Sequence, residues 1–231
     1  MPDRRDALGT ITMAQAIARR KCRIRNLGRI DYGRALELQQ QLVDGRKQGL
    51  IPDQLLLMEH PHVITLGRNG QMANLLANEE VLLRAGIAFY PTDRGGDITY
   101  HGPGQLVGYP ILDLREWKRD VGAYVRAIEQ VIIDTLADYG ISGGRIPKLT
   151  GVWVEGRKIA AIGVHISRWV TSHGFALNVS TDLSYFGYIV PCGLTRPVTS
   201  MNSLGVRVTP EEVSATLTAH FGRIFGVETE N

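Results

Sequence analysis

The chain has 231 residues and a mass of 25.5 kDa, which is enough for one large domain with a sizeable core. Hydrophobic residues make up 44% and charged residues 21%, as in ordinary globular proteins, and a net charge of +3 is too small to indicate a nucleic-acid partner. No apolar stretch reaches the ~20 residues of a membrane span, and the first 20 residues lack the apolar segment of a secretory signal. We therefore expect a cytoplasmic protein without a membrane partner.

The sequence of the N-terminal half predicts a short extension followed by two helices and four strands. Residues 1–22 show little apolar periodicity, so we expect a flexible extension there and a single domain over residues 23–231. Strong helix formers predict a helix over residues 31–46, and a second, short helix ends before Gly86. Short apolar segments predict four strands, at residues 55–58, 63–66, 87–90 and 106–112.

The C-terminal half contains the clearest helix, over residues 120–139, where apolar residues recur every three or four positions. Two strand-like segments, 151–155 and 158–167, meet at Glu155-Gly156 and predict a β-hairpin whose turn type the sequence leaves open. A strand at 175–179 and a helix at 210–225 follow. Strands outnumber helices and are joined by short turns, which indicates an α+β fold with a mixed, largely antiparallel sheet and packed helices.

The most unusual segment is residues 94–105, R-G-G-D-I-T-Y-H-G-P-G-Q, which we call the glycine-rich segment. Glycine is costly in ordered structure, so this density predicts sharp turns or close approach of another group. An apolar strand follows at once, and loops that start from core strands commonly carry binding residues. The glycine spacing matches neither a P-loop nor the dinucleotide fingerprint.

Cys192 and Lys158 are the residues best suited to covalent chemistry. Cys192 lies between a proline and a glycine, where the chain turns and a sulfur can face a cleft, although a structural role fits equally well. A nucleophilic cysteine needs a group that lowers its pKa. Lys158 enters an apolar strand that would partly desolvate its ammonium group, which suits a proton-transferring base. His60 and His62 lack a third partner at metal-binding spacing, so we expect neither a metal nor a cofactor.

These residues lie in motifs that resemble the lipoyl(octanoyl) transferase family. The resemblance runs from about Ile24 to the final helix. It includes L-L-L-M-E-H-P at 55–61, T-L-G-R at 65–68, the glycine-rich segment and the strand after it, T-G-V-W-V at 150–154, residues 158–167, H-G-F-A-L-N-V at 173–179, and V-P-C-G at 190–193. Several long motifs in the same order are far more specific than any one of them.

The resemblance implies a fold shared with the catalytic domains of biotin and lipoate protein ligases, a mixed sheet with helices on one face. It implies that an octanoyl or lipoyl group moves from acyl carrier protein to a lysine of lipoyl domains in 2-oxoacid dehydrogenases or of the glycine-cleavage H protein. Cys192 would carry the acyl group as a thioester and Lys158 would lower its pKa. The substrate site would comprise Arg94, Gly95, Gly96, Asp97, Ile98, Thr99, Tyr100, His101, Ala161, Ile162, Gly163, Gly174, Phe175 and Ala176.

Two alternatives remain beside this interpretation. An ATP-dependent lipoate or biotin ligase would form an acyl-adenylate and leave Cys192 idle, and a non-catalytic acyl-protein binding module would need neither Cys192 nor Lys158. For a transferase, main-chain N–H groups near Gly163 or Gly174 are the candidate donors to the oxyanion of each tetrahedral intermediate.

Overall fold

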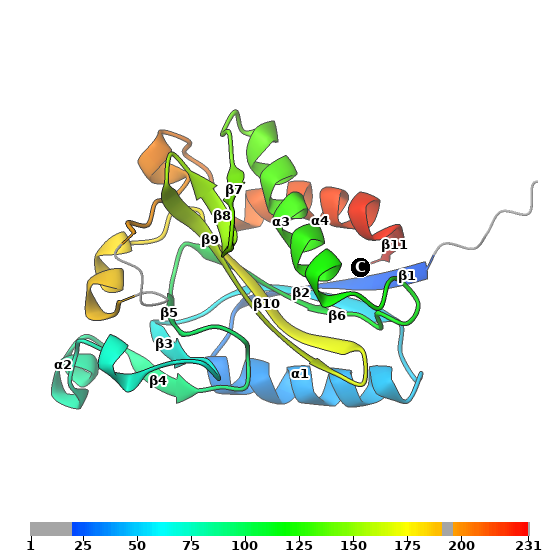
Figure 1. The fold of residues 1–231 in the computed structure, drawn as a ribbon, viewed down its shortest axis with the longest axis horizontal. Coiled ribbons are helices and arrows are strands. Elements are labelled where there is room, and N and C mark those ends of the chain that lie inside the picture. Colours follow the sequence, from blue (N-terminus) through cyan, green and yellow to red (C-terminus); the bar gives the residue numbers. More distant parts are fainter. Residues whose placement is uncertain (1–19, 191–195, 231) are drawn as a thin grey trace, which may run out of the picture.

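The computed structural model describes residues 20–190 and 196–230, which fold around one twisted eight-stranded sheet (Figure 1). Strand β1 is parallel to β2 and β11, and every other pair in this sheet is antiparallel, so the predicted mixed, largely antiparallel α+β fold is confirmed. The strand order is β11 (Val227–Glu230), β1 (Arg20–Arg29), β2 (Asp53–Glu59), β6 (Gln105–Ile111), β10 (Val170–Asn178), β9 (Arg157–Ser167), β8 (Leu149–Val154) and β7 (Gly144–Ile146).

A second, three-stranded sheet lies beside the end of the large one and consists of β4 (Ala88–Pro91), β3 (Val63–Leu66) and β5 (Ile98–His101). Strand β5 lies inside the glycine-rich segment, where the sequence predicted a loop. Its main chain pairs with β3, and its side chains Ile98 and Tyr100 are fully buried, which stabilises the strand. The small helix α2 (Glu79–Arg84) and the 3₁₀ helices η1 (Met72–Asn74) and η2 (Leu183–Tyr188) pack around this sheet.

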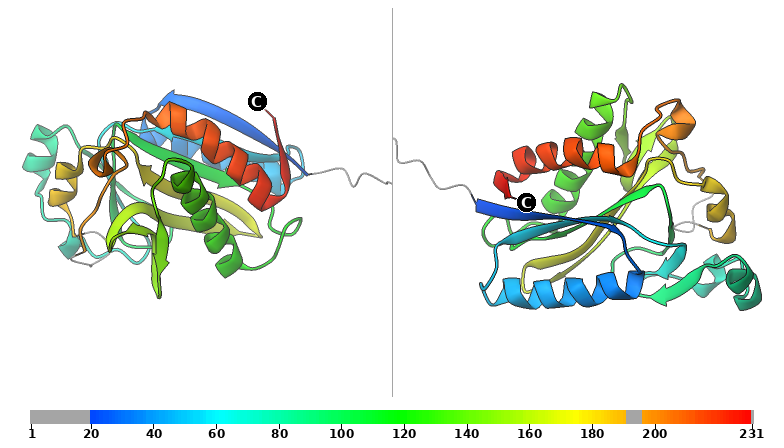
Figure 2. Two further views of the ribbon diagram at one scale, coloured as in Figure 1. Left: turned by 90° about the horizontal axis from the view of Figure 1, so that it is seen from above. Right: turned by 180° about the vertical axis from the view of Figure 1, so that it is seen from behind.

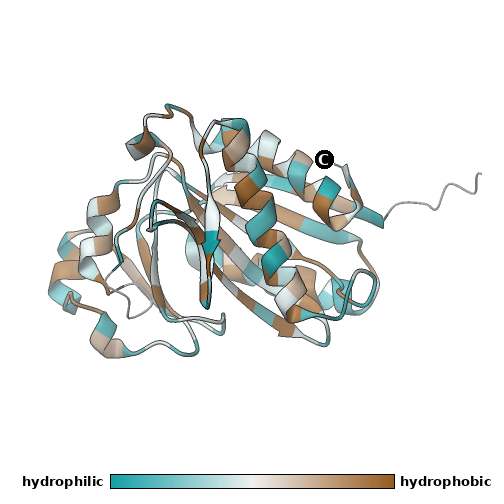
Figure 3. Ribbon diagram, turned by 45° about the horizontal axis from the view of Figure 1, so that its top comes forward, coloured by the Kyte–Doolittle hydropathy of each residue, from teal (hydrophilic) through white to brown (hydrophobic). Residues whose placement is uncertain are grey.

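Helices cover both faces of the large sheet, which corrects the expectation of helices on one face (Figures 1 and 2). Alternate residues of β2 point to opposite faces. Leu55 and Leu57 pack with α3 (Val121–Asp138) and α4 (Pro210–Phe225), whereas Leu56 and Met58 pack with α1 (Tyr32–Lys47). Figure 3 shows apolar and polar residues interspersed along α3 and α4, as expected for helices with one buried face.

The helix bounds follow from capping side chains that are visible in the sequence. Asp31, Asn78 and Asp120 each accept a hydrogen bond from a main-chain N–H in the first turn of α1, α2 and α3. Thr209 forms a capping box with Glu212 at the start of α4, which also has a proline at its first position. The helices predicted at residues 120–139 and 210–225 are therefore confirmed to within one residue at each end.

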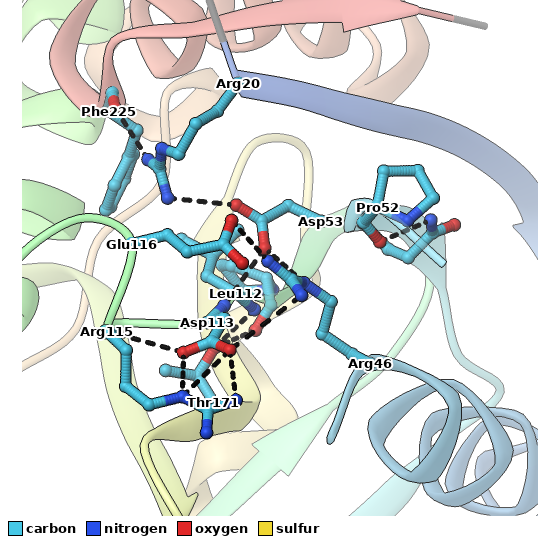
Figure 4. Close-up of polar contacts among 12 residues, drawn as sticks. Arg20, Arg46, Pro52, Asp53, Leu112, Asp113, Arg115, Glu116, Thr171 and Phe225 are labelled. Atoms are coloured by element: carbon cyan, nitrogen blue, oxygen red, sulfur yellow. Dashed lines mark hydrogen bonds and ion pairs between the residues drawn. The ribbon is translucent and has the colours of Figure 1, made fainter. Parts of the chain in front are cut away.

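The domain begins earlier than the sequence predicted. Strand β1 starts at Arg20, so Arg20, Lys21 and Cys22 belong to the sheet and not to the extension. A buried ionic cluster fixes this region (Figure 4). Arg46 of α1 contacts Asp53 of β2 at 2.8 Å and Glu116 at 2.7 Å, and Arg20 contacts the other oxygen of Asp53 at 3.2 Å.

Candidate functional site

A cavity of about 540 Å³ opens where the glycine-rich segment crosses the edge of β9. Its walls come from segments that lie far apart in the sequence. Its lining residues are Tyr32, Asn69, Arg94–Thr99, His101, Tyr109, Val125, Lys148–Thr150, Lys158, Ala161–Val164 and His173–Ala176. Most of these side chains and main-chain groups are apolar or uncharged, with a few charged residues at the rim. That composition and volume are typical of a small-molecule site.

The glycine-rich segment forms one wall because its main chain bonds directly to β9 and to the turn after β3. The Gly95 N–H donates to the Val164 carbonyl at 2.9 Å, and the Gly67 N–H donates to the Asp97 carbonyl at 3.1 Å. A Cβ atom added at Gly163 would lie 2.7 Å from the Gly95 carbonyl oxygen, so the two chains approach too closely for a side chain. These glycines therefore serve contact between chain segments.

Arg94 holds this wall in place through hydrogen bonds to neighbouring segments. It is buried, and its guanidinium donates to the Thr65 hydroxyl and carbonyl at 2.7–3.1 Å and to the Gly95 carbonyl at 3.2 Å. Asp97 accepts hydrogen bonds from Ile98 N–H and from the Asn74 side chain. The two charged residues at the start of the segment thus both bond to neighbouring protein groups and hold the wall in place.

The structure brings thirteen of the fourteen predicted substrate-site residues, together with Lys158, to this one cavity. Tyr100 differs: it is fully buried, its hydroxyl lies 2.7 Å from His62 Nδ1, and its ring stacks on Tyr185 in the core of the small sheet. Strand alternation explains this, because Ile98 and Tyr100 share one face of β5 while Thr99 points to the other. That the lining residues bind substrate stays a prediction.

Neutral histidines and tyrosines form the floor of the cavity. His101 is 6% exposed, with Nδ1 2.8 Å from the Gln105 side-chain oxygen, and burial lowers its pKa to about 3. His60 Nε2 lies 2.8 Å from the Tyr109 hydroxyl, and burial lowers the pKa of His60 as well. His101 is therefore uncharged near neutral pH and suits hydrogen bonding more than proton transfer.

His173 ties the glycine-rich wall to β10. Its Nε2 lies 2.7 Å from Asp93, and this hydrogen bond, more than any other contact, lowers the Asp93 pKa to about 2. The main-chain N–H of His173 donates to Gln39 of α1, and its φ of 54° is the left-handed region that non-glycine residues rarely adopt. Strain of this kind persists only where surrounding contacts hold it, as these do.

Lys158 lies at the rim, with Nζ 4.8 Å from the centre of the Trp153 ring. Its main-chain N–H donates to the Pro197 carbonyl and its carbonyl accepts from Thr199 N–H, both at 2.9 Å. The segment that follows residue 195 thus pairs with Lys158. Cys192, the predicted nucleophile, lies outside the described residues.

Cys22, the other cysteine, is unsuited to nucleophilic chemistry. It lies in β1 with no exposed surface, and burial raises the pKa of its thiol. A buried thiol in apolar surroundings is inert because the reactive form is the thiolate. Among the described residues no cluster of three or more His, Cys, Asp or Glu side chains is arranged to hold a metal ion.

The direction of the β9 main chain narrows the expected oxyanion donors, which were main-chain N–H groups near Gly163 or Gly174. Along an antiparallel strand, the N–H and C=O of one residue point to the same side, and successive residues alternate. The Val164 carbonyl bonds to the glycine-rich segment, away from β10, so Gly163 points toward β10, where it pairs with Gly174. Ile162 points the same way as Val164, and the described β8–β9 pairs stop before it. The N–H of Ile162, and not that of Gly163 or Gly174, is therefore directed to the cavity.

Nine lining residues were not among the predicted site residues: Tyr32, Asn69, Tyr109, Val125, Lys148, Leu149, Thr150, Val164 and His173. Tyr109 and His173 lie in strands whose apolar neighbours dominate the pattern, and Tyr32 begins a helix far upstream. His173 carried one usable signal, since it belongs to the H-G-F-A-L-N-V motif. Lys148 follows a proline in an exposed turn, and nothing in the sequence distinguishes it from other surface lysines.

Solved structures define the class of fold. Lipoate-protein ligase A bound with ATP superposes with a TM-score of 0.73 and 18% identity, covering 91% of this chain and 90% of that one. A lipoate protein ligase from Thermoplasma acidophilum gives 0.70 and 17%, covering 91% and 88%. Biotin protein ligase from Aquifex aeolicus in complex with biotin and ATP gives 0.53 and 12%, covering 88% and 70%. The chain thus has the lipoate and biotin protein ligase fold.

Sequence relatives define the family within that fold. The lipoyl protein ligase A/B catalytic domain family matches residues 31–222. An octanoyltransferase of Solibacter usitatus is 75% identical over 209 residues, covering 90% of this chain and 95% of the relative. Another from Koribacter versatilis is 56% identical over 207 residues, covering 87% and 82%. The chain therefore belongs to the octanoyltransferase family, a family of acyltransferase enzymes.

No helix in the described part of the chain has the length and apolar character needed to cross a membrane.

Proposed function

We propose that the chain transfers an octanoyl or lipoyl group from acyl carrier protein to a specific lysine of lipoate-dependent proteins, through a thioester on Cys192. The acceptors would be the lipoyl domains of 2-oxoacid dehydrogenases and the glycine-cleavage H protein. Residues 20–231 would act as a single catalytic domain in the cytoplasm. This proposal rests on membership of the octanoyltransferase family and on the chemistry of the cavity.

The reaction has two displacements. In the first, the Cys192 thiolate attacks the donor's thioester carbonyl, a new carbon–sulfur bond forms, and the carrier's thiolate leaves and takes up a proton. In the second, the acceptor's neutral lysine amine attacks the Cys192 thioester, an amide forms, Cys192 leaves as thiolate, and the amine nitrogen loses a proton. The first step exchanges thioesters of similar energy and the second forms a more stable amide, so neither needs ATP.

The contact between Lys158 and residues 197–199 is the observation that carries the proposal. It fixes a lysine at the rim of the cavity beside the chain segment that follows Cys192. An ammonium group near a thiol favours the thiolate and lowers the thiol pKa. The same lysine can take up and return the protons that the two displacements release and consume.

The walls suit an acyl thioester. Ile162, Phe175 and Leu149 supply an apolar slot for the chain. The Ile162 N–H, directed to the cavity, is the candidate donor to the oxyanion of each tetrahedral intermediate. His101, uncharged on the floor, would position the substrate and leave proton transfer to Lys158.

Intact mass after incubation with octanoyl-acyl carrier protein, without ATP, tests the proposal. We expect an added octanoyl group that hydroxylamine removes and that is missing in Cys192→Ser. A Cys22→Ser variant is the matched control and should still be acylated, because that thiol is buried. Failure to acylate, combined with ATP-dependent labelling of an acceptor domain, would instead support a ligase, the activity named for the structural relatives at 17–18% identity.

A further inference from the structure

Lys148 occupies an unusual position at the tip of the hairpin formed by β7 and β8. The two turn residues are Pro147 and Lys148, and Lys148 has a φ of 67°. A proline followed by a residue with positive φ is the pattern of a type II turn, whose second central position strongly favours glycine or asparagine. A lysine there carries a conformational cost, and it places a cation at the cavity rim.

The other charged residue of this hairpin, Arg145, is paired with groups of the protein itself. Glu129, a buried residue of α3, accepts hydrogen bonds from the Arg145 side chain at 2.7 Å and from the Gly151 N–H at 3.1 Å. Arg145 also donates to the Arg126 carbonyl and to Gln130. Its charge is therefore matched within the protein. Lys148, in contrast, is exposed and takes part in none of the ion pairs found among the described residues.

Lys158 is a second cation that lines the cavity, and its Nζ lies 4.8 Å from the centre of the Trp153 ring. Asp97 of the glycine-rich segment also lines the cavity, but its carboxylate is held by the Asn74 side chain. Lys148 and Lys158 thus give the rim positive charge, which attracts an anion.

We propose that Lys148, at the rim of the cavity, binds the phosphodiester of the donor's phosphopantetheine arm. This inference rests on the proposed function and identifies how the same site recognises its donor. The same covalent linker joins the phosphate to the thioester sulfur in every such donor. A donor whose carbonyl lies in the cavity would therefore place its phosphate near the cavity rim. A lysine on a rigid, strained turn is preorganised to meet it, which reduces the entropy lost on binding.

Small thioester donors lack the acidic side chains of a carrier protein, so they allow the contribution of the phosphate to be measured by itself. We would measure kcat/KM for octanoyl-4′-phosphopantetheine and for octanoyl-pantetheine, with a lipoyl domain as acceptor. Wild type should prefer the phosphorylated donor by roughly 3- to 10-fold at low salt, and the preference should shrink as salt is added. Lys148→Gln should abolish most of this preference by raising KM for the phosphorylated donor.

Lys148→Gly separates this role from a structural one. Glycine relieves the positive φ, so its melting temperature should not fall, yet the phosphate preference should be lost. Arg168→Gly is the matched control, since Arg168 is also an exposed cation at positive φ in a hairpin turn but does not line the cavity. It should keep the preference. Equal use of both donors by wild type, or a preference retained in both Lys148 variants, would overturn the inference. Transfer from neither thioester, nor from octanoyl-acyl carrier protein, would overturn the proposed function beneath it.

Discussion

His101 should make the fold sensitive to acid well above the pH at which carboxylates titrate. Burial lowers its pKa from an ordinary 6.5 to about 3. Between these values the unfolded chain binds a proton that the folded chain does not, so stability is complete above about pH 6.5 and decreases as the pH falls. Each pKa unit is worth about 1.4 kcal/mol, so this residue alone should remove about 2 kcal/mol of unfolding free energy between about pH 8 and pH 5. His60, whose pKa burial also lowers, should steepen the loss.

Urea unfolding at several pH values measures this effect, and His101→Asn isolates it. Asparagine keeps a short polar side chain beside Gln105 but does not titrate. The variant should be less stable than wild type near pH 8, and the difference should narrow by about 2 kcal/mol toward pH 5. A difference that stays constant across this range would show that His101 takes up a proton in the folded protein as readily as in the unfolded chain, and its lowered pKa would then be wrong.

Three other substitutions have defined outcomes. Gly174→Ala should cost about 1–3 kcal/mol by urea unfolding, since its Cβ would overlap the Gly108 carbonyl, whereas Gly144→Ala meets open space and should be neutral or stabilising. Arg46→Ala should cost about 3 kcal/mol because it leaves the buried Asp53 and Asp113 with one arginine each, while Arg84→Ala, in an exposed pair, should cost less than about 0.5 kcal/mol. In Lys158→Ala, alkylation of Cys192 should require a higher pH than in wild type, and an unchanged pH profile would remove Lys158 from its proposed role.

The sequence predicted helices better than strands because helix ends are marked locally. The side chains of Asp120 and Thr209 cap the first turns of α3 and α4, and both predicted ranges agree with the structure. The outer strands carry no comparable mark. Strand β1 alternates arginines with buried Cys22 and Ile24, and β11 reads V-E-T-E, so each becomes a strand only through its neighbours in the sheet.

The lining residues that lie in sequence motifs could be predicted. Those that reach the cavity only through the tertiary arrangement of distant elements could not. The glycine-rich segment was predicted as a binding segment from its glycines, and the residues of β9 and β10 were expected in the site because the family resemblance implied them. Tyr32 and Val125 reach it from helices on opposite faces of the sheet, and no local pattern shows that two such helices meet at one opening. Tyr100 shows the converse: motif membership predicted it in the site, whereas its side chain is buried and its hydroxyl lies beside His62, so its role in the site stays a prediction.

The glycines of the site allow the close approach that the sequence predicted, and the group that approaches is the protein's own main chain. Close approach of a substrate would explain a bare main chain, but the nearest neighbours are other parts of the protein. A Cβ at Gly67 would overlap the Gly96 carbonyl, and one at Gly163 would lie 2.7 Å from the Gly95 carbonyl. The glycine-rich wall can therefore lie directly on β9, and side chains at these positions would push it outward. The distance between the glycine-rich wall and β9 is therefore set by contact between two main-chain segments.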